Sequence, residues 1–338
     1  MDSAGRFLAL IDALAGRRVA VIGDVVADEF VYGQVARVSR EAPVLILEYD
    51  STEVVPGGAG NAANNVAALG GRVRLAAVVG RDDPGARLVA ALHRRVDRAG
   101  VVRAAGAGTP VKTRILAGGI HSAKQQVVRI DRGVRRPWNP RARAAFERAA
   151  LKAVKNVDAI LVSDYGSGLV TPALVARLRR AVPGAGAGAG AGTPILIDTR
   201  YRLLDYRGLT ACTPNESEVE QALGIRIDDS LKALERAGRE ILAQTKMRAV
   251  LVTRGSRGMA LFEPDRPTAH IPISGSDEIA DVTGAGDTVM ATVALAVAAG
   301  ATFEQAARLA NCAGGIVVMK RGTATVTPGE LREAVRRG

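Results

Sequence analysis

Short apolar runs alternate with amphipathic, helix-forming segments along most of this chain. Each run has the length of a buried strand, and several end at a carboxylate or a glycine. Strands that alternate with helices favour a parallel sheet covered on both faces, so we predict a three-layer α/β/α fold with a mainly parallel central sheet. The strands expected on this pattern are 17–24, 73–80, 158–166, 193–200 and 247–255.

Helices are expected between these strands. Residues 62–70 form a small-residue segment that Gly70 and Gly71 close, and 83–96 begins with an acidic residue and a proline, which is typical of a helix start. Residues 1–16 carry an early acid and no basic leader, so we expect an amphipathic helix there and not a signal peptide.

Two regions break this alternation. Residues 29–55 and 111–131 alternate polar and apolar positions with the period of a strand and contain no helical segment. They predict a small antiparallel sheet added to the main domain, which we call the lid. Residues 183–193 are a low-complexity Gly-Ala stretch between a helix and a strand, and they predict a surface insertion without function.

Composition narrows the classes of partner. The chain has 338 residues, is 48% hydrophobic and holds no apolar run of membrane length, so we expect no membrane association. Its net charge is +12, but the basic residues are spread along the chain and only 3% of residues are aromatic, which argues against nucleic acid and leaves an anionic small molecule open. Cys212 and Cys312 lack metal-ligand spacing, and a reducing cytoplasm is the simplest setting.

The sequence DVTGAGD at 281–287 is the strongest chemical signal. Gly284, Ala285 and Gly286 offer backbone N–H groups at the start of an apolar helix, where anions bind. Asp287 falls in the first turn, where a carboxylate suits phosphoryl transfer as the proton acceptor, and we expect the helix terminus to lower its pKa. A tight turn before a buried helix explains the motif about equally well when it is taken alone.

Other segments offer sugar-binding chemistry. Gly57 and Gly58 precede Asn61 at another helix start, and they would let a ligand approach the backbone while the amide contacts a hydroxyl. Asp24 and Asp28 follow the first strand, where an open α/β sheet binds its ligands. Acidic residues at strand ends serve equally well as helix caps.

Two further motifs are ambiguous by themselves. Asn215 and Glu218 lie three residues apart at a helix start, which suits ligand contact but also a simple capped start. Residues 251–259 read as a strand followed by a glycine-punctuated turn, which could be a plain hairpin.

The joint occurrence and order of these motifs resembles the ribokinase-like (PfkB) carbohydrate kinases over nearly the whole chain. The resemblance implies an ATP-dependent sugar kinase of the ribokinase-like fold, with 1–338 as one kinase domain and the lid inserted in it. It implies that Asp287 is the catalytic base and that Gly284, Ala285 and Gly286 form the anion hole.

The same resemblance assigns the remaining sites. It implies Mg²⁺ organised by Glu218, K⁺ as a possible second cation near Asp281 and Gly322, and a homodimer that forms through the lid. The residues implied for the nucleotide are Asn215, Thr253, Gly255, Gly258 and Asn311, and those implied for the sugar are Asp28, Gly57, Gly58 and Asn61.

A narrower resemblance points to the kinases of ADP-heptose synthesis. Those enzymes phosphorylate D-glycero-D-manno-heptose 7-phosphate at its anomeric hydroxyl and give the 1,7-bisphosphate. The segments that carry the resemblance are 23–44, 56–67, 111–115, 124–131 and 314–331. In many such proteins a nucleotidyltransferase domain follows, and within these 338 residues we expect only the kinase.

An anionic sugar phosphate needs cations. Strand alternation places Lys112 and Arg114 on one face of the lid, and Lys124 and Arg129 lie nearby in the sequence, so we expect these four residues to hold the phosphate. For any single one of them, a solvated charge is an equally good interpretation. Another kinase of the family, acting on ribose, fructose or a nucleoside, is the alternative function, followed by a sugar-binding protein without catalysis. The complete G-x-G-x-x-G and Walker motifs of dinucleotide enzymes and P-loop NTPases are absent from the sequence.

Overall fold

The computed structural model describes residues 3–118, 124–133, 138–182, 184, 192–274 and 281–337. Most of the Gly-Ala stretch 183–193 lies outside the described residues, so the insertion expected there stays a prediction. Within the described residues, no helix combines the length and the apolar character that crossing a membrane requires.

A nine-stranded sheet forms the centre of the molecule, in the order β13-β12-β11-β10-β9-β8-β1-β4-β5. The ladders from β11 through to β5 are parallel, and β11–β12 and β12–β13 are antiparallel, so the sheet is mainly parallel as predicted. The strands are β1 (Arg18–Gly23), β4 (Arg72–Gly80), β5 (Val96–Ala104), β8 (Ala159–Asp164), β9 (Ile195–Thr199), β10 (Ala211–Cys212), β11 (Ala249–Thr253), β12 (Met259–Phe262) and β13 (Ala269–Ile271).

Helices cover both faces of this sheet, because alternate residues of each buried strand point to opposite sides. Val19 and Val21 pack on one face against α1 (Ser3–Ala13), α2 (Ala59–Ala68), α3 (Asp83–Ala90), α8 (Ala285–Ala298), α9 (Phe303–Val318) and α10 (Pro328–Arg337). Ala20 and Ile22 pack on the other against α4 (Pro140–Ala153), α5 (Pro172–Ala181), α6 (Glu216–Leu223) and α7 (Leu231–Thr245). The three-layer α/β/α prediction is therefore confirmed.

One expected helix is shorter than predicted. Helix α3 ends at Ala90, and the chain enters the edge strand β5 at Val96, so the helix predicted over 83–96 is wrong over residues 91–96, and β5 was not predicted. Asp82 caps the helix by accepting a hydrogen bond from the Gly85 N–H at 3.0 Å.

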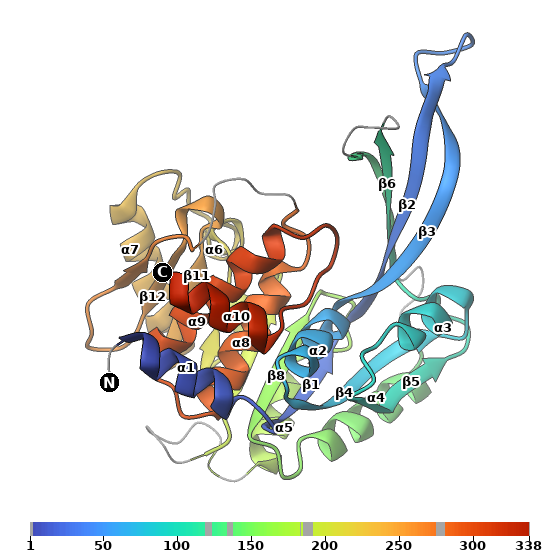
Figure 1. Cartoon of the computed structure of the whole chain (residues 1–338). Coiled ribbons are helices and arrows are strands. Elements are labelled where there is room, and N and C mark those ends of the chain that lie inside the picture. The colour runs from blue at the N-terminus through green and yellow to red at the C-terminus, as the bar shows by residue number, and fades with distance from the viewer. Residues whose placement is uncertain are drawn as a thin grey trace.

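The lid is a four-stranded sheet that projects from the body (Figure 1), in the order β3-β2-β6-β7. Its strands are β2 (Val25–Val38), β3 (Leu45–Gly58), β6 (Val111–Gly118) and β7 (Gln125–Arg132). The β2–β3 and β6–β7 pairs are antiparallel as predicted, but β2 and β6 pair in parallel. The wholly antiparallel lid is therefore wrong: β6 returns from the main sheet and runs alongside β2 in the same direction.

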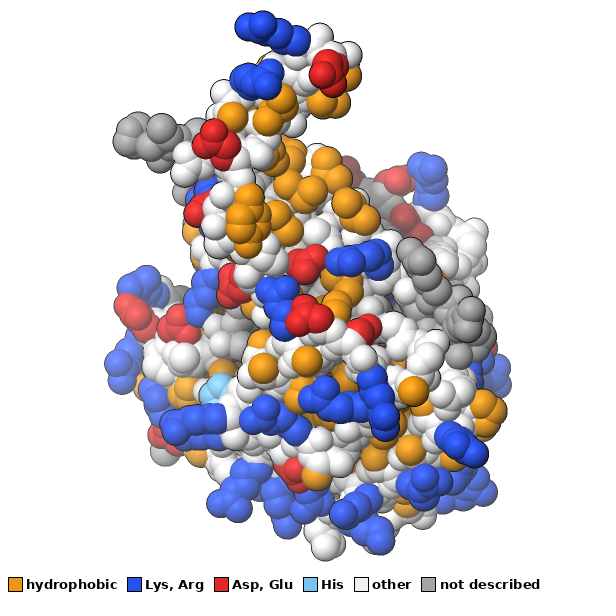
Figure 2. Space-filling model, turned by 90° about the vertical axis from the view of Figure 1, so that its right-hand side faces the viewer, with side chains coloured by type: hydrophobic (Ala, Val, Ile, Leu, Met, Phe, Trp, Pro, Cys, Tyr) orange, Lys and Arg blue, Asp and Glu red, His pale blue; other side chains and the backbone are white. Residues whose placement is uncertain are grey.

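The lid exposes apolar side chains to solvent, and Figure 2 shows them along the projecting part of the molecule. Val38 is 60% exposed and Tyr49 is 70% exposed. Five more apolar residues of the lid strands are exposed, namely Val35, Leu45, Val127, Val128 and Ile130.

Candidate active site

Helix α8 begins at the carboxyl edge of the sheet with the glycine-rich turn. Gly284 is its N-cap, with a φ of +76°, and a Cβ there would lie 2.5 Å from Asn61 Nδ2. Both the backbone conformation and the space therefore require glycine at this position. A Cβ at Gly286 would meet no atom within 4 Å, so this residue faces open space at the helix N-terminus.

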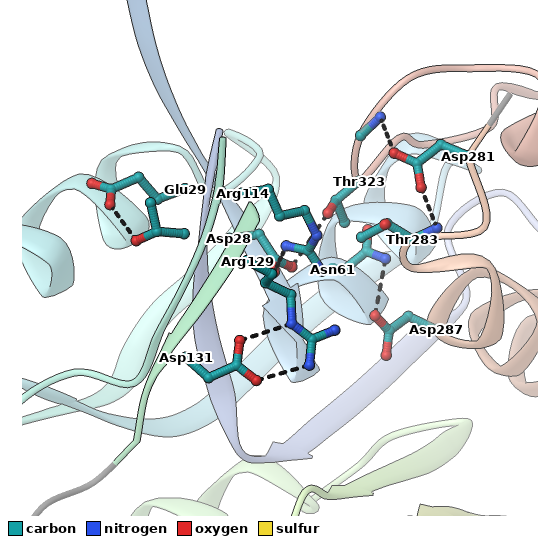
Figure 3. Close-up of polar contacts among 12 residues, drawn as sticks. Asp28, Glu29, Asn61, Arg114, Arg129, Asp131, Asp281, Thr283, Asp287 and Thr323 are labelled. Carbon is teal, nitrogen blue, oxygen red and sulfur yellow. Dashed lines mark hydrogen bonds and ion pairs between the residues drawn. The ribbon is translucent and has the colours of Figure 1, made fainter. Parts of the chain in front are cut away.

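Asp287 is buried in the first turn of α8, with 4% of its surface exposed. Its Oδ2 accepts a hydrogen bond from Asn61 Nδ2 at 3.0 Å, and its Oδ1 accepts one from the Tyr165 hydroxyl at 3.1 Å. Figure 3 shows the Asn61 contact. Burial raises the pKa of Asp287 to about 7, and the bonds from Asn61 and Tyr165 oppose this shift. The expectation of a lowered pKa is therefore wrong, because desolvation outweighs the helix terminus.

Asp28 and Arg114 form a nearly buried ion pair at 2.5 Å between Asp28 Oδ1 and Arg114 Nη1 (Figure 3). Thr323 donates to the other Asp28 oxygen at 3.3 Å. A Cβ on Gly57 would lie 2.2 Å from that same oxygen, so glycine is required for the carboxylate to sit there. Two of the residues predicted to contact substrate thus bind each other in this structure.

Asp24 holds the loop after β8. Its carboxylate accepts hydrogen bonds from the Tyr165 N–H at 2.9 Å, from the Ser167 N–H at 3.1 Å and from the Ser167 hydroxyl. Burial raises the pKa of Asp24 to about 6. These contacts hold the backbone of the loop that carries Tyr165, whose hydroxyl binds Asp287.

The predicted Asn215–Glu218 pair forms a reciprocal cap on α6. Glu218 Oε2 accepts from the Asn215 N–H, and Asn215 Oδ1 accepts from the Glu218 N–H, both at 2.9 Å. The simple capped start is therefore present, and both residues also face the cavity described next. Burial raises the pKa of Glu218, and it raises that of Asp198 well above its usual range, with the Glu218 and Asp287 carboxylates adding to the latter shift.

These groups surround a cavity of about 440 Å³, the central cavity. It lies where β1, β8, β9 and β10 end, which is where parallel α/β sheets bind ligands. Predicted site residues in its wall are Asp28, Gly58, Lys112, Arg114, Arg129, Asn215, Glu218, Thr253, Gly284, Gly286 and Asp287. The structure therefore brings together residues from 28 to 287, which are distant in sequence.

The donor set of the central cavity suits magnesium. Its carboxylates repel one another, and hard divalent cations prefer oxygen ligands. In the part of the chain that the structure describes, no cluster of three His, Cys, Asp or Glu side chains could hold a metal ion. An ion bound by one or two carboxylates, water and a ligand phosphate fits this arrangement.

Three residues predicted to bind the nucleotide lie outside the central cavity. Gly255 and Gly258 begin and follow a short 3-10 turn (Gly255–Arg257), and a Cβ on Gly258 would lie 2.1 Å from the Ile271 carbonyl oxygen. Asn311 is buried in α9 and donates to the Pro272 carbonyl at 2.7 Å. It lines a separate cavity of about 850 Å³ together with Cys312.

The predicted cation residues Asp281 and Gly322 are in contact. Asp281 accepts hydrogen bonds from the Thr283 N–H at 2.8 Å and from the Gly322 N–H at 3.0 Å. The carboxylate joins the loop before α8 to the loop after α9. Gly322 packs against the Phe30 ring, at the base of the lid.

The lid cations have different surroundings. Lys112 and Arg129 line the central cavity, and Arg129 forms a two-bond contact with Asp131 at 2.9 Å (Figure 3). Lys124 pairs with Asp50 at 2.5 Å and does not line the central cavity. The structure therefore does not bring all four cations to one point.

Sequence reasoning did not place several residues of the central cavity in the site, among them Tyr165, Asp198 and Arg200. Tyr165 follows β8, Asp198 lies near the end of β9 and Arg200 follows β9. The strand-end rule that selected Asp24 would have selected them as well.

Comparison with known proteins matches residues 17–329 to the family model described as pfkB family carbohydrate kinase. The chain is 44% identical over 323 residues to the bifunctional protein HldE of Caulobacter vibrioides, covering 94% of this chain and 63% of that protein. It is 42% identical over 317 residues to that of Geobacter metallireducens, covering 92% and 61%. The chain thus spans about three fifths of the length of these relatives.

Solved structures agree on the fold. A ribokinase of Arabidopsis thaliana complexed with ribose and ATP matches with a TM-score of 0.68 and 19% identity, covering 96% of this chain and 98% of that one. Phosphofructokinase-2 of Escherichia coli in complex with potassium matches with a TM-score of 0.70 and 16% identity, covering 96% and 99%.

Proposed function

The chain belongs to the pfkB family of carbohydrate kinases, and we propose that it transfers the γ-phosphoryl group of ATP to a sugar hydroxyl in the central cavity. One observation carries this proposal: Asp287 is buried beside the backbone N–H groups of the α8 N-terminus and faces the cavity. A protein that only bound sugar would need no proton acceptor beside an anion hole, whereas Asp287, whose pKa burial raises to about 7, supplies one.

Asp287 serves as the base in this proposal. Each of its oxygens accepts one hydrogen bond, and a carboxylate oxygen has a second lone pair for a sugar hydroxyl. A pKa of about 7 makes it a stronger base than an ordinary carboxylate. The N–H groups at Gly284 and Gly286 stabilise the negative charge of the phosphoryl group in transfer, and the Ala285 N–H, which donates to the Val282 carbonyl oxygen at 3.2 Å, holds the turn that presents them.

The nucleotide lies along the loops that follow β10 and β11 in this proposal. Asn215 and Thr253 line the central cavity and border its phosphate end, and Gly255, Gly258 and Asn311 contact the remainder. Mg²⁺, when bound, would neutralise phosphate charge, with Glu218 as its nearest support. Asp28, Gly58 and Asn61 position the sugar at Asp287.

We further propose D-glycero-D-manno-heptose 7-phosphate as the substrate, phosphorylated at its anomeric hydroxyl to the 1,7-bisphosphate. The likeness to the HldE proteins supports this choice, and so does Lys112, a cation of the cavity wall that forms no ion pair with a carboxylate among the described residues. The test is ADP release with ATP and Mg²⁺ on a panel of heptose 7-phosphate, free heptose, ribose and fructose. A strong preference for the 7-phosphate is expected. Equal efficiency on ribose or fructose would leave only the general sugar kinase, and no ADP from any sugar would refute the kinase.

Three features of the assembly complete the proposal. Residues 1–338 act as one kinase domain that forms a homodimer through the apolar side chains exposed on the lid. K⁺ binds near Asp281 and Gly322. Because ATP is the phosphoryl donor and both cysteines are free thiols, we place the protein in the cytoplasm.

A further inference from the structure

A second cavity, the side cavity, adjoins the central cavity and has a volume of about 570 Å³. The two cavities share Lys112, Tyr165 and Arg200 in their walls. Tyr165 separates the two cavities. Its hydroxyl donates to Asp287, and its ring centroid lies 5.5 Å from Lys112 Nζ. The side cavity therefore begins one tyrosine ring away from the proposed base.

The wall of the side cavity carries surplus positive charge. Arg143 of α4 and Arg200 after β9 line it together with Lys112, and among the described residues none of the three forms an ion pair with a carboxylate. Arg143 Nε donates only to the Trp138 carbonyl, at 3.3 Å. Arg200 lies over the Tyr201 ring at 5.7 Å.

The carboxylates in the same wall are already engaged. Asp24 accepts three hydrogen bonds from the loop after β8, and Asp131 binds Arg129 through both oxygens. Arg132, a fourth cation of this wall, is paired with Glu29 at 3.0 Å. Lys112, Arg143 and Arg200 are therefore the cations left for an anionic ligand.

The loop between the cavities leaves room at this wall. Gly166 and Gly168 have φ angles of +82° and +81°, and a Cβ on Gly168 would lie 3.4 Å from Arg143 Nη2. Glycine thus keeps the backbone close to the guanidinium without a side chain between them.

We propose that the side cavity binds the distal phosphate of a sugar phosphate whose reacting hydroxyl lies at Asp287, with Arg143, Arg200 and Lys112 as its cations. This inference rests on the proposed sugar kinase and names the part of the site that selects an anionic substrate. Arginine suits the task because its planar guanidinium binds phosphate oxygens in pairs. Arg114 and Lys124, expected from the sequence to hold this phosphate, are instead engaged by Asp28 and Asp50.

The test replaces Arg143 by methionine, which keeps an unbranched apolar stem and removes the charged guanidinium. In Arg143→Met the KM for heptose 7-phosphate rises by about 10-fold or more, while the KM for ATP and the efficiency on free heptose stay unchanged. Arg143→Lys restores part of the loss. Arg141→Met is the matched control, because Arg141 lies on the same helix, is exposed and lines neither cavity.

A binding measurement separates this inference from the proposed function. Calorimetric titration with heptose 7-phosphate in the absence of ATP gives the affinity of each variant without turnover. Tight binding to the unsubstituted protein that Arg143→Met weakens, with no ADP formed when ATP is added, would overturn the kinase and keep the phosphate site. Turnover of heptose 7-phosphate with equal affinity in Arg143→Met and Arg141→Met would overturn the phosphate site and keep the kinase. No binding of heptose 7-phosphate to the unsubstituted protein would overturn the phosphate site.

Discussion

Replacing Asp287 by asparagine is expected to remove activity and to stabilise the protein. Asparagine has nearly the same shape, so its oxygen can still accept from Asn61 and its amide can donate to the Tyr165 hydroxyl oxygen. The change removes a negative charge that burial destabilises. It also removes the proton acceptor, so we expect turnover to fall by about 100-fold or more.

The stability gain follows from the pKa of Asp287, which is 3.8 in the unfolded chain and about 7 in the folded protein. Because the pKa of Asp287 is higher in the folded protein than in the unfolded chain, the carboxyl group does not destabilise the fold at pH values below 3.8, where it is protonated in both states. The cost then grows as the pH rises and is complete above the folded value. A shift of this size corresponds to roughly 4 kcal/mol at about 1.4 kcal/mol per pH unit, so we expect a gain of about 2 to 4 kcal/mol at pH 8.

Urea unfolding at pH 8 and pH 5 measures this effect, and at pH 5 the gain should shrink to less than about half. Asp158→Asn is the control of opposite sign, because the hydrogen bond from Arg18 lowers the pKa of Asp158. That variant should lose stability at pH 8. The reasoning fails if Asp287→Asn is less stable than the unsubstituted protein at pH 8, or if its gain does not depend on pH.

Three further predictions concern the same site. The kcat/KM of the unsubstituted protein should rise with pH through about 7, because Asp287 ionises there. Tyr165→Phe should move this rise to higher pH, because it removes a hydrogen-bond donor that lowers the pKa of Asp287. An unchanged pH profile would contradict the contact between Tyr165 and Asp287. Gly286→Val should lower activity by about 100-fold with little change in the free energy of unfolding, because a Cβ there meets no atom but occupies the anion hole. Loss of folding instead would indicate that the turn is purely structural. Asp281→Asn should abolish any stimulation by K⁺ over choline, because it loosens the two loops that Asp281 joins; absence of stimulation in the unsubstituted protein would remove the cation from the proposal.

Much of the fold could be predicted from the chain because buried strands and their flanking helices have local signatures. The apolar strand at 17–24 and the capped start at Asn215 depend on neighbours only a few residues away. Strand β5 was missed because it is an edge strand that includes Asp97 and Gly100, and only its pairing with β4 makes it a strand.

The sequence identified residues of the candidate site more readily than it indicated their pKa values and ion pairs. The glycine turn and Asp287 were found because helix starts have a recognisable sequence. The raised pKa of Asp287 was not, because the desolvation that raises it depends on how segments more than one hundred residues away, those of Asn61 and Tyr165 among them, pack around the carboxylate. The ion pair of Lys124 could not be predicted for the same reason, since its partner Asp50 lies in β3.

The lid is continuous with the site from which it extends. Strand β2 carries Asp28 near its base and extends to Val38, with two irregularities in its pairing with β3, while β3 returns to the glycines Gly57 and Gly58. Ten residues of strand span about 33 Å, so a rotation of about 10° at Asp28 would displace the far end by roughly 6 Å. If ligand binding at Asp28 rotates the lid, a fluorophore attached near Val38 would detect that rotation as a displacement of several ångströms.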